Sequence, residues 1–152
     1  MKRFEFNLQA VRDLRDSEES HSRAEYAQAM RLMEAFNMRR REIEQAIEDN
    51  LKESRQECGR PTRSDLLTSL RDMLAALKDR IKALEPEEAE LKKLVASKWE
   101  NLVAARRKRE ALDKLRDKQK QAHDHQSERH EQKAIDEMAT QRASSRTSPY
   151  MI

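Results

Sequence analysis

Leucine recurs at every seventh residue through the middle of this chain, and that repeat restricts the fold more than any other feature. The series is Leu70, Leu77, Leu84 and Leu91, and a second series, Leu67, Leu74, Ile81, Val95 and Leu102, fills the complementary heptad position, broken at Glu88. Apolar residues spaced alternately three and four apart line one side of an α-helix, which buries them against a second helix. The repeat therefore predicts a long coiled-coil helix.

The composition limits the partner of this helix to another narrow element. Only 36% of the residues are hydrophobic and 4% aromatic, against 40% charged, which leaves too little apolar material for a globular core. One glycine and three prolines in 152 residues are too few for a typical disordered chain, and residues with high helix propensity dominate. The 32 basic and 29 acidic residues are interleaved, so the net charge of +3 does not require a nucleic-acid partner.

The strongest chain-breaking signal in the first 85 residues is the pair Gly59 and Pro61. Gly59 can adopt the left-handed conformation that ends a helix, and Thr62 with Asp65 has capping-box-like spacing for the start of the next one. Before this turn, an apolar stripe with a period nearer to about 3.6 than to about 3.5 residues is interrupted at Arg40. Its members are Ala29, Met33, Phe36, Ile43, Ile47 and Leu51.

The two apolar stripes face each other if the chain folds back at this turn, with Leu51 opposite Leu70 and Ile43 opposite Leu77. The sequence therefore predicts an all-α fold, in which two long helices form an antiparallel coiled-coil hairpin. Pro86 removes one backbone donor, which predicts a kink or a short break nearby. We expect a single domain over 1–142, with a first helix over about 8–57, a turn over about 58–63, a second helix over about 64–142, and a disordered tail over 143–152.

The second helix is expected to overhang the first. A first helix of the expected length reaches about 75 Å at about 1.5 Å per residue, so its partner region on the second helix ends near Leu115. Residues 116–133 hold almost no large apolar side chain, and a short stripe follows, made by Ala134, Ile135, Met138 and Ala139. An overhanging helix of this kind needs a partner or frays.

The sequence argues against catalysis and against a bound cofactor or metal. A single glycine excludes the phosphate-binding loops of the Walker and Rossmann types, which need at least two. His123, His125 and His130 stand two, five and seven residues apart, and neither the first nor the last of these spacings brings two imidazoles to one ion on a helix. A two-helix layer also has no concave pocket in which the pKa of a catalytic group is tuned. We therefore expect no enzyme activity.

The same absence of special segments leads us to expect a cytoplasmic protein. No apolar run approaches the roughly 20 residues that span a bilayer, so membrane insertion is not expected, and charges interrupt the N-terminus before a signal peptide can form. Cys58 is the single cysteine and can form no internal disulfide, which suits a reducing compartment.

Three surface features have more than one interpretation. Residues 106–120 hold eight basic side chains against three acidic ones. This stretch is either a solvated helix face, a contact for an acidic protein surface, or a contact for nucleic acid, although it has no aromatic residues for base stacking. Leu66 and Met73, with Leu70, form either a docking patch near the turn or a widened core stripe. Trp99 either covers the edge of the core or anchors a partner.

Three stretches together resemble the FliJ family, the small coiled-coil component of the flagellar type III export apparatus. They are residues 4–15 (FEFNLQAVRDLR), 106–115 (RRKREALDKL) and 131–139 (EQKAIDEMA). Their order and spacing, together with the length and the hairpin layout, match across nearly the whole chain. The middle of the first helix carries no family signature, and Pro86 is expected to interrupt a helix that a stiff stalk would need to be continuous.

The resemblance implies a stalk-like hairpin that binds and stimulates the hexameric export ATPase with its joined helix termini. It also implies contacts with the cytoplasmic domain of the export gate and with export chaperones, at the cytoplasmic face of the inner membrane. On this hypothesis the ATPase-binding residues are Phe4, Phe6, Leu8, Val11, Arg106, Arg107, Arg109, Leu112, Leu115, Ile135, Asp136 and Glu137, and the gate-docking residues are Leu66, Leu70 and Met73. The alternatives are a generic cytoplasmic coiled-coil adaptor and a basic helical nucleic-acid binder.

Overall fold

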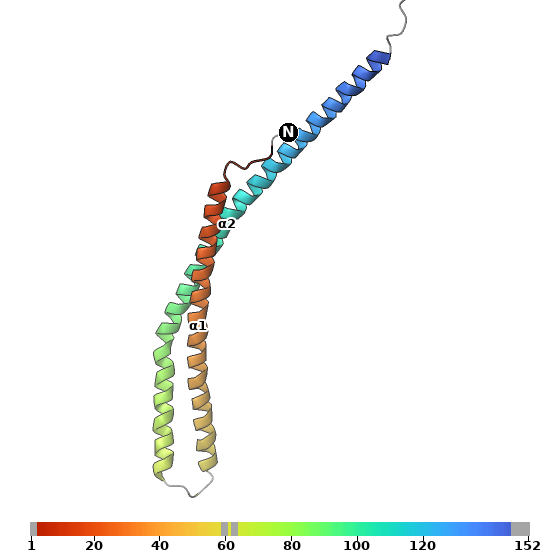
Figure 1. Cartoon of the computed structure of the whole chain (residues 1–152). Coiled ribbons are helices and arrows are strands. Elements are labelled where there is room, and N and C mark those ends of the chain that lie inside the picture. The colour runs from red at the N-terminus through yellow and green to blue at the C-terminus, as the bar shows by residue number, and fades with distance from the viewer. Residues whose placement is uncertain (1–2, 59–60, 62–63, 147–152) are drawn as a thin grey trace, which may run out of the picture. The chain divides into compact units, whose positions relative to one another are not determined.

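Two long helices packed antiparallel make up nearly all of the described part of the chain (Figure 1), which confirms the predicted all-α hairpin. The computed structural model describes residues 3–58, 61 and 64–146. Helix α1 spans Gln9–Glu57 and helix α2 spans Ser64–Arg146. Helix α2 therefore includes residues 143–146, which the sequence assigned to a tail. Gly59 and Thr62, on which the predicted turn and cap depend, lie outside the described residues.

Pro86 lies inside α2, and the helix continues through it, so of the two predicted outcomes, a kink or a short break, the break does not occur. Proline lacks the N–H that would bond to the carbonyl of Lys82, four residues earlier. Both Pro86 and Lys82 are exposed, so water can satisfy the carbonyl that the proline leaves without an intrahelical partner. A helix can therefore accept proline at this position on its outer side.

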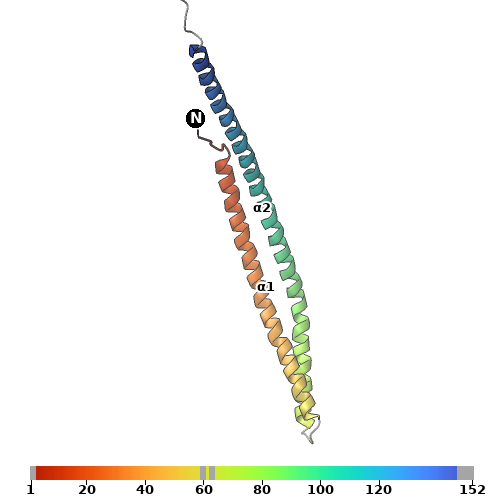
Figure 2. The same cartoon turned by 90° about the vertical axis from the view of Figure 1, so that its right-hand side faces the viewer.

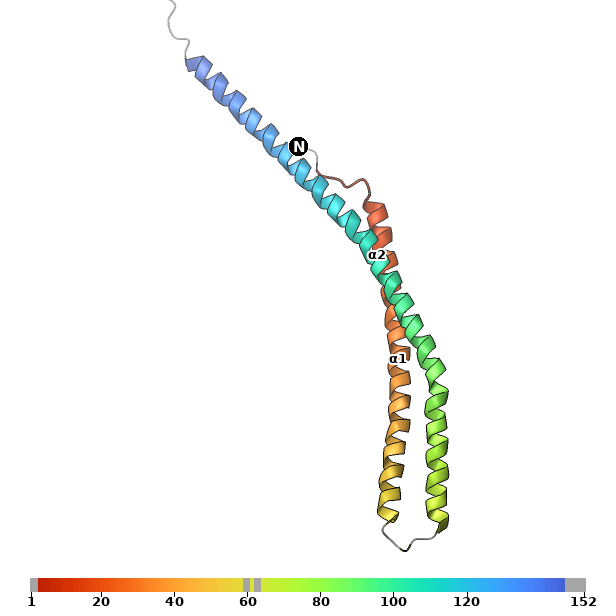
Figure 3. The same cartoon turned by 180° about the vertical axis from the view of Figure 1, so that it is seen from behind.

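The chain divides into two compact units. The first, here called the hairpin unit, comprises residues 18–105, in which the later part of α1 and the earlier part of α2 lie side by side (Figures 2 and 3). The second, here called the terminal unit, comprises residues 1–17 and 106–152, of which 3–17 and 106–146 are described. Each unit buries its own contacts between the two helices.

The seam of the hairpin unit follows a strict heptad on both helices. On each helix, buried or half-buried positions include an unbroken series spaced alternately three and four apart. The series are 19, 22, 26, 29, 33, 36, 40, 43, 47, 50, 54 and 57 on α1, and 67, 70, 74, 77, 81, 84, 88, 91, 95, 98, 102 and 105 on α2. The predicted 3.6-residue period of the first helix was therefore wrong. Polar residues occupy several seam positions, and these had hidden the heptad.

The apolar part of this seam is built from small and large side chains. Phe36 is the largest fully buried side chain, with 1% of its surface exposed, and Ala29, Leu70 and Leu77 are also buried. Fully burying one such large apolar side chain stabilises a fold by about 1.5–3 kcal/mol. Because the seam is one layer thick, a few of these residues hold the hairpin together.

Arg40 and Glu88, the two charged residues that interrupt the apolar stripes, pair with each other across the seam. The Arg40 Nη1 atom donates to Glu88 Oε2 at 2.8 Å, although the two residues are 48 positions apart in sequence. Lys92 Nζ also lies 2.8 Å from Glu88 Oε1. The hydrogen bond from Lys92, followed by the charges of Lys92 and Arg40, holds the pKa of Glu88 below its ordinary value. Each interruption therefore has its complement on the other helix.

Two further polar side chains lie within the seam itself. Asn50 is 4% exposed, and its Nδ2 donates to the carbonyl of Leu70 at 3.1 Å, whereas its Oδ1 accepts no hydrogen bond. Glu19 is 3% exposed and accepts a hydrogen bond from Arg23 Nη2 at 2.8 Å. Buried polar groups at heptad core positions cost stability and disfavour pairings of the helices that leave those groups unpaired. Leu51, predicted to face Leu70, is half-buried beside Asn50.

Candidate functional site

Two phenylalanines of the N-terminal segment before α1 make contacts within the terminal unit. Phe6 is buried, and its carbonyl accepts a hydrogen bond from the backbone N–H of Gln9 at 3.0 Å, at the start of α1. The ring of Phe4 lies 5.6 Å from the ring of His123 on α2. Figure 1 shows this segment running beside α2. An extended chain covers about 3.3 Å per residue against about 1.5 Å in a helix, so these few residues reach well beyond the predicted end of contact near Leu115.

An ion-pair network joins the first turns of α1 to α2 in the same unit. Arg12 Nε donates to Asp113 Oδ1 at 2.6 Å, and Arg109 Nη1 donates to Asp113 Oδ2 at 2.5 Å. Arg109 Nε also lies 4.0 Å from Asp16 Oδ1. The hydrogen bond and then the charge of Arg12, with a further contribution from Arg109, hold the pKa of Asp113 below its ordinary value of 3.8. One carboxylate thus links both helices.

Asp113→Asn should loosen the first turns of α1, because the neutral amide cannot pair with two guanidinium groups. A carboxylate with a depressed pKa stabilises the folded state fully above its ordinary pKa, and this contribution is lost as the pH falls through the folded-state value. Backbone amide exchange over residues 12–16 should therefore accelerate severalfold in the variant at neutral pH. In the parent chain the same acceleration should appear only below pH 3.8. Equal exchange in both chains at neutral pH would contradict the assigned role.

Some basic side chains of residues 106–120 on α2 form ion pairs within the molecule, and others are exposed to solvent. Arg109 is half-buried in the network just described, whereas Arg106 is exposed and pairs within α2 with Glu110 at 2.8 Å. Arg107, Lys114 and Lys118 are exposed, and none of them has an ion pair among the described residues. Their spacings of seven and four residues place them on one side of α2, here called the basic strip. At the level of sequence, Lys114 and Lys118 belonged to the basic stretch 106–120 but were not among the individually predicted ATPase-binding residues.

An apolar row lies exposed at the start of α1. Leu8, Val11 and Leu14 follow one another at intervals of three residues and are 37%, 40% and 56% exposed. Leu14 was missed at the level of sequence, although its spacing from Val11 is the signal that reveals it. On α2, Leu112 is half-buried and Leu115 is exposed. The terminal unit therefore presents both apolar and basic side chains to solvent, a combination typical of protein-binding surfaces.

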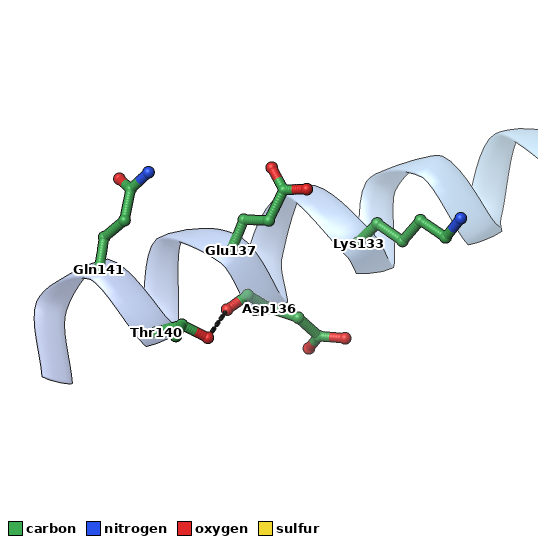
Figure 4. A pocket seen from close by; sticks show the side chains of 5 residues that line it. All are labelled: Lys133, Asp136, Glu137, Thr140 and Gln141. Atoms are coloured by element: carbon green, nitrogen blue, oxygen red, sulfur yellow. Dashed lines mark hydrogen bonds between the residues drawn. The ribbon is translucent and has the colours of Figure 1, made fainter. Parts of the chain in front are cut away.

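The last part of α2, here called the overhang, comprises residues 128–146. Every side chain from 128 to 144 is exposed, including the predicted binding residues Ile135, Asp136 and Glu137. Figure 4 shows Lys133, Asp136, Glu137, Thr140 and Gln141 projecting from this single helix, with Thr140 Oγ1 donating to the carbonyl of Asp136 at 2.7 Å. All five lining residues belong to α2, so the shallow depression between them is an open surface rather than a ligand pocket.

The three residues of the predicted patch near the turn differ in their exposure to solvent. Leu66 and Met73 are exposed, at 39% and 53%, whereas Leu70 is buried in the seam beside Asn50. A partner can therefore reach Leu66 and Met73 directly, and Leu70 supports the helix beneath them. Leu70 therefore belongs to the core stripe, whereas the docking role of Leu66 and Met73 stays a prediction.

Trp99 covers the edge of a shallow apolar groove in the hairpin unit. Its ring lies 5.3 Å from that of Tyr26, and half of its surface remains exposed. The other side chains that line the groove are Met33, Lys92, Val95 and Ala96. The contact with Tyr26 shields one side of the seam.

The described residues hold no group of three or more His, Cys, Asp or Glu side chains that could bind a metal ion. Within the same part of the chain, neither helix has a stretch apolar enough to cross a bilayer. Cys58 is exposed at the end of α1.

Comparison with known proteins supports one family. The curated proteins and the solved structures each give no significant match to the chain. The family model described as "Flagellar FliJ protein" matches residues 4–148, which is nearly the whole sequence and includes both units. The chain therefore belongs to the FliJ family, a non-catalytic component of the flagellar protein export apparatus.

Proposed function

We propose that the terminal unit binds the hexameric export ATPase and stimulates it in the manner of a central stalk. Family membership supports a role in the flagellar export apparatus, and the chemistry of the exposed surface supports the contact with the ATPase. The observation that carries the proposal is that one unit presents the apolar row Leu8, Val11 and Leu14 together with the basic strip. Apolar side chains supply contact area in such an interface, and the unpaired cations attract an acidic partner surface.

The geometry of an α-helix suits a moving contact. A helix with its side chains is about 10–12 Å wide, so one or two helices can enter the opening of a ring. Attraction between a basic strip and acidic walls acts over about 8–10 Å and does not depend on close-fitting pockets. A stalk bound in this way can turn relative to the ring without breaking a fixed set of hydrogen bonds.

We further propose a docking site at the turn end of the hairpin unit and a cellular location for the protein. Leu66 and Met73 are the exposed side chains that would dock on the cytoplasmic domain of the export gate. Export chaperones are further partners that family membership suggests. We place the protein in the cytoplasm, peripherally associated with the export apparatus at the inner membrane.

A charge-reversal variant tests the ATPase contact. The triple variant R107E/K114E/K118E should raise the concentration of the chain that gives half-maximal stimulation of ATP hydrolysis by at least about tenfold, because three attractions become repulsions. Hydrolysis and hexamer formation are measured together, by phosphate release and by light scattering.

The hairpin unit offers a matched control. Arg71, Lys78 and Lys82 are exposed residues of the same types at the same spacings on α2. The variant R71E/K78E/K82E should stimulate the ATPase like the parent chain. Equal stimulation by both triple variants would rule out the basic strip as the contact, and no stimulation by the parent chain would reject the stalk role.

A further inference from the structure

The overhang carries its own heptad stripe, which is not a continuation of the seam. Glu128, Glu131, Ile135, Met138 and Arg142 are spaced alternately three and four residues apart, and we call them the overhang stripe. The seam positions of α2 in the terminal unit include 109, 112, 116, 123 and 127, and this series would continue through 130, 134, 137 and 141. The overhang stripe is therefore displaced by one residue from the seam series.

This displacement changes the direction in which the apolar side chains point. One residue corresponds to a rotation of about 100° around an α-helix. Ile135 and Met138 therefore face well away from the side of α2 that contacts the N-terminal segment, and they are 54% and 52% exposed. Apolar residues that continued the seam series could pack on an extension of the same hairpin. Ile135 and Met138 are instead placed to pack on a separate helix.

The order of charges along the overhang stripe indicates which helix fits. Acidic residues Glu128 and Glu131 come first, Ile135 and Met138 form the centre, and Arg142 follows. A second overhang lying antiparallel places Glu131 opposite Arg142, and Ile135 opposite Met138, on both sides of a two-fold axis. A parallel arrangement would instead place Glu131 opposite Glu131. The stripe is thus complementary in charge to its own reverse.

We propose that the overhang is a self-docking surface, on which a second copy of this chain pairs antiparallel through the overhang stripe. Ala134 and Ala139 flank the centre of the overhang stripe, and their small side chains allow close approach of the helices. The interface covers on the order of 1,000 Å² or less, which is the range of weak and transient complexes. Dimers should therefore form at roughly 10–500 µM.

Sedimentation equilibrium of the full-length chain and its variants tests this pairing. Glu131→Arg alone brings two guanidinium groups together at both of the contacts that join position 131 to Arg142, and Arg142→Glu alone brings two carboxylates together in the same way. Each single variant should raise the dimer dissociation constant at least about fivefold. In an antiparallel mixed dimer of the two variants, both of these contacts join opposite charges, so an equimolar mixture should associate more tightly than either variant alone. A parallel dimer would only exchange one pair of like charges for another in each single variant, so the weakening by the single variants is the result that distinguishes the two arrangements. Positions 131 and 142 are both exposed, so the variants are expected to fold.

The double variant E131R/R142E completes the charge-swap test. It exchanges the two charges within one chain, so every contact between positions 131 and 142 in its antiparallel dimer again joins opposite charges. Its dissociation constant should therefore return to within about twofold of the parent value. Lys133→Glu reverses a charge outside the overhang stripe, and it should leave the dissociation constant unchanged.

Two outcomes would overturn the proposal. One is a parent chain that stays monomeric at about 500 µM. The other is a double variant that associates no better than the two single variants. Because only this chain is present in the experiment, the result does not depend on the proposed contact with the ATPase.

Discussion

Leu77→Asp should destabilise the hairpin unit by at least about 3 kcal/mol, because it places an unpaired carboxylate where a leucine side chain is buried. The seam is one layer thick, so no second layer of core residues compensates for the loss. The free energy of unfolding is measured by urea denaturation followed by circular dichroism, which reports the loss of helix directly. We expect the midpoint to fall sharply, and helix content to fall already without urea if the parent chain is only marginally stable.

Leu32→Asp is the matched control for this prediction. Leu32 lies on α1, and half of its surface is exposed, so the same substitution buries no charge there. Its expected cost is about 0.5–1 kcal/mol, which is the difference in helix propensity between leucine and aspartate. Similar losses in the two variants would mean that Leu77 does not belong to the core of the hairpin.

Deleting residues 128–152 should leave the thermal midpoint of the chain within about 2 °C of its original value, while it abolishes stimulation of the export ATPase. The first expectation follows from burial, since every side chain from 128 to 144 is exposed and contributes little to packing. The second follows from the family resemblance, which implies that Ile135, Asp136 and Glu137 belong to the ATPase contact. Calorimetry and the hydrolysis assay measure the two effects on the same samples.

The position of this truncation is set by the fold. Phe4 packs on His123, so a deletion that began at residue 116 would also remove the support of the N-terminal segment. A shorter deletion of residues 147–152 serves as the control and should retain stimulation. Loss of several degrees in the thermal midpoint on removal of 128–152 would show that the overhang packs against the rest of the chain. Retained stimulation would place the ATPase contact elsewhere.

The leucine heptad of α2 and the single Gly59–Pro61 break were sufficient to predict the antiparallel hairpin. Helical periodicity is a local property, because residues three and four apart share one face whatever the helix packs against. The family resemblance rested on short stretches at both ends of the chain, and the family match over residues 4–148 bears it out. These features needed no knowledge of contacts between distant residues.

The candidate site was less accessible to such an argument. The family resemblance assigned Arg109 to the ATPase contact, yet its guanidinium pairs with Asp113, which also accepts a hydrogen bond from Arg12. Exposed Leu14, by contrast, was not predicted, although it lies three positions after Val11. Whether a side chain makes contacts within the fold or stays exposed for a partner depends on which residues of the opposite helix lie against it.

The sequence on its own thus defined two helices, their direction and the place where the chain reverses, since each follows from spacing and from one glycine and one proline. Tertiary structure alone decided how the polar seam positions are satisfied: Arg40 meets Glu88, and Asn50 donates to the carbonyl of Leu70. A polar residue at a heptad position looks like an interruption until its partner, 20 or 48 residues away, is known. The hydrogen bonds and ion pairs of these residues join positions that are distant in sequence, whereas helical periodicity depends only on neighbouring residues of one chain segment.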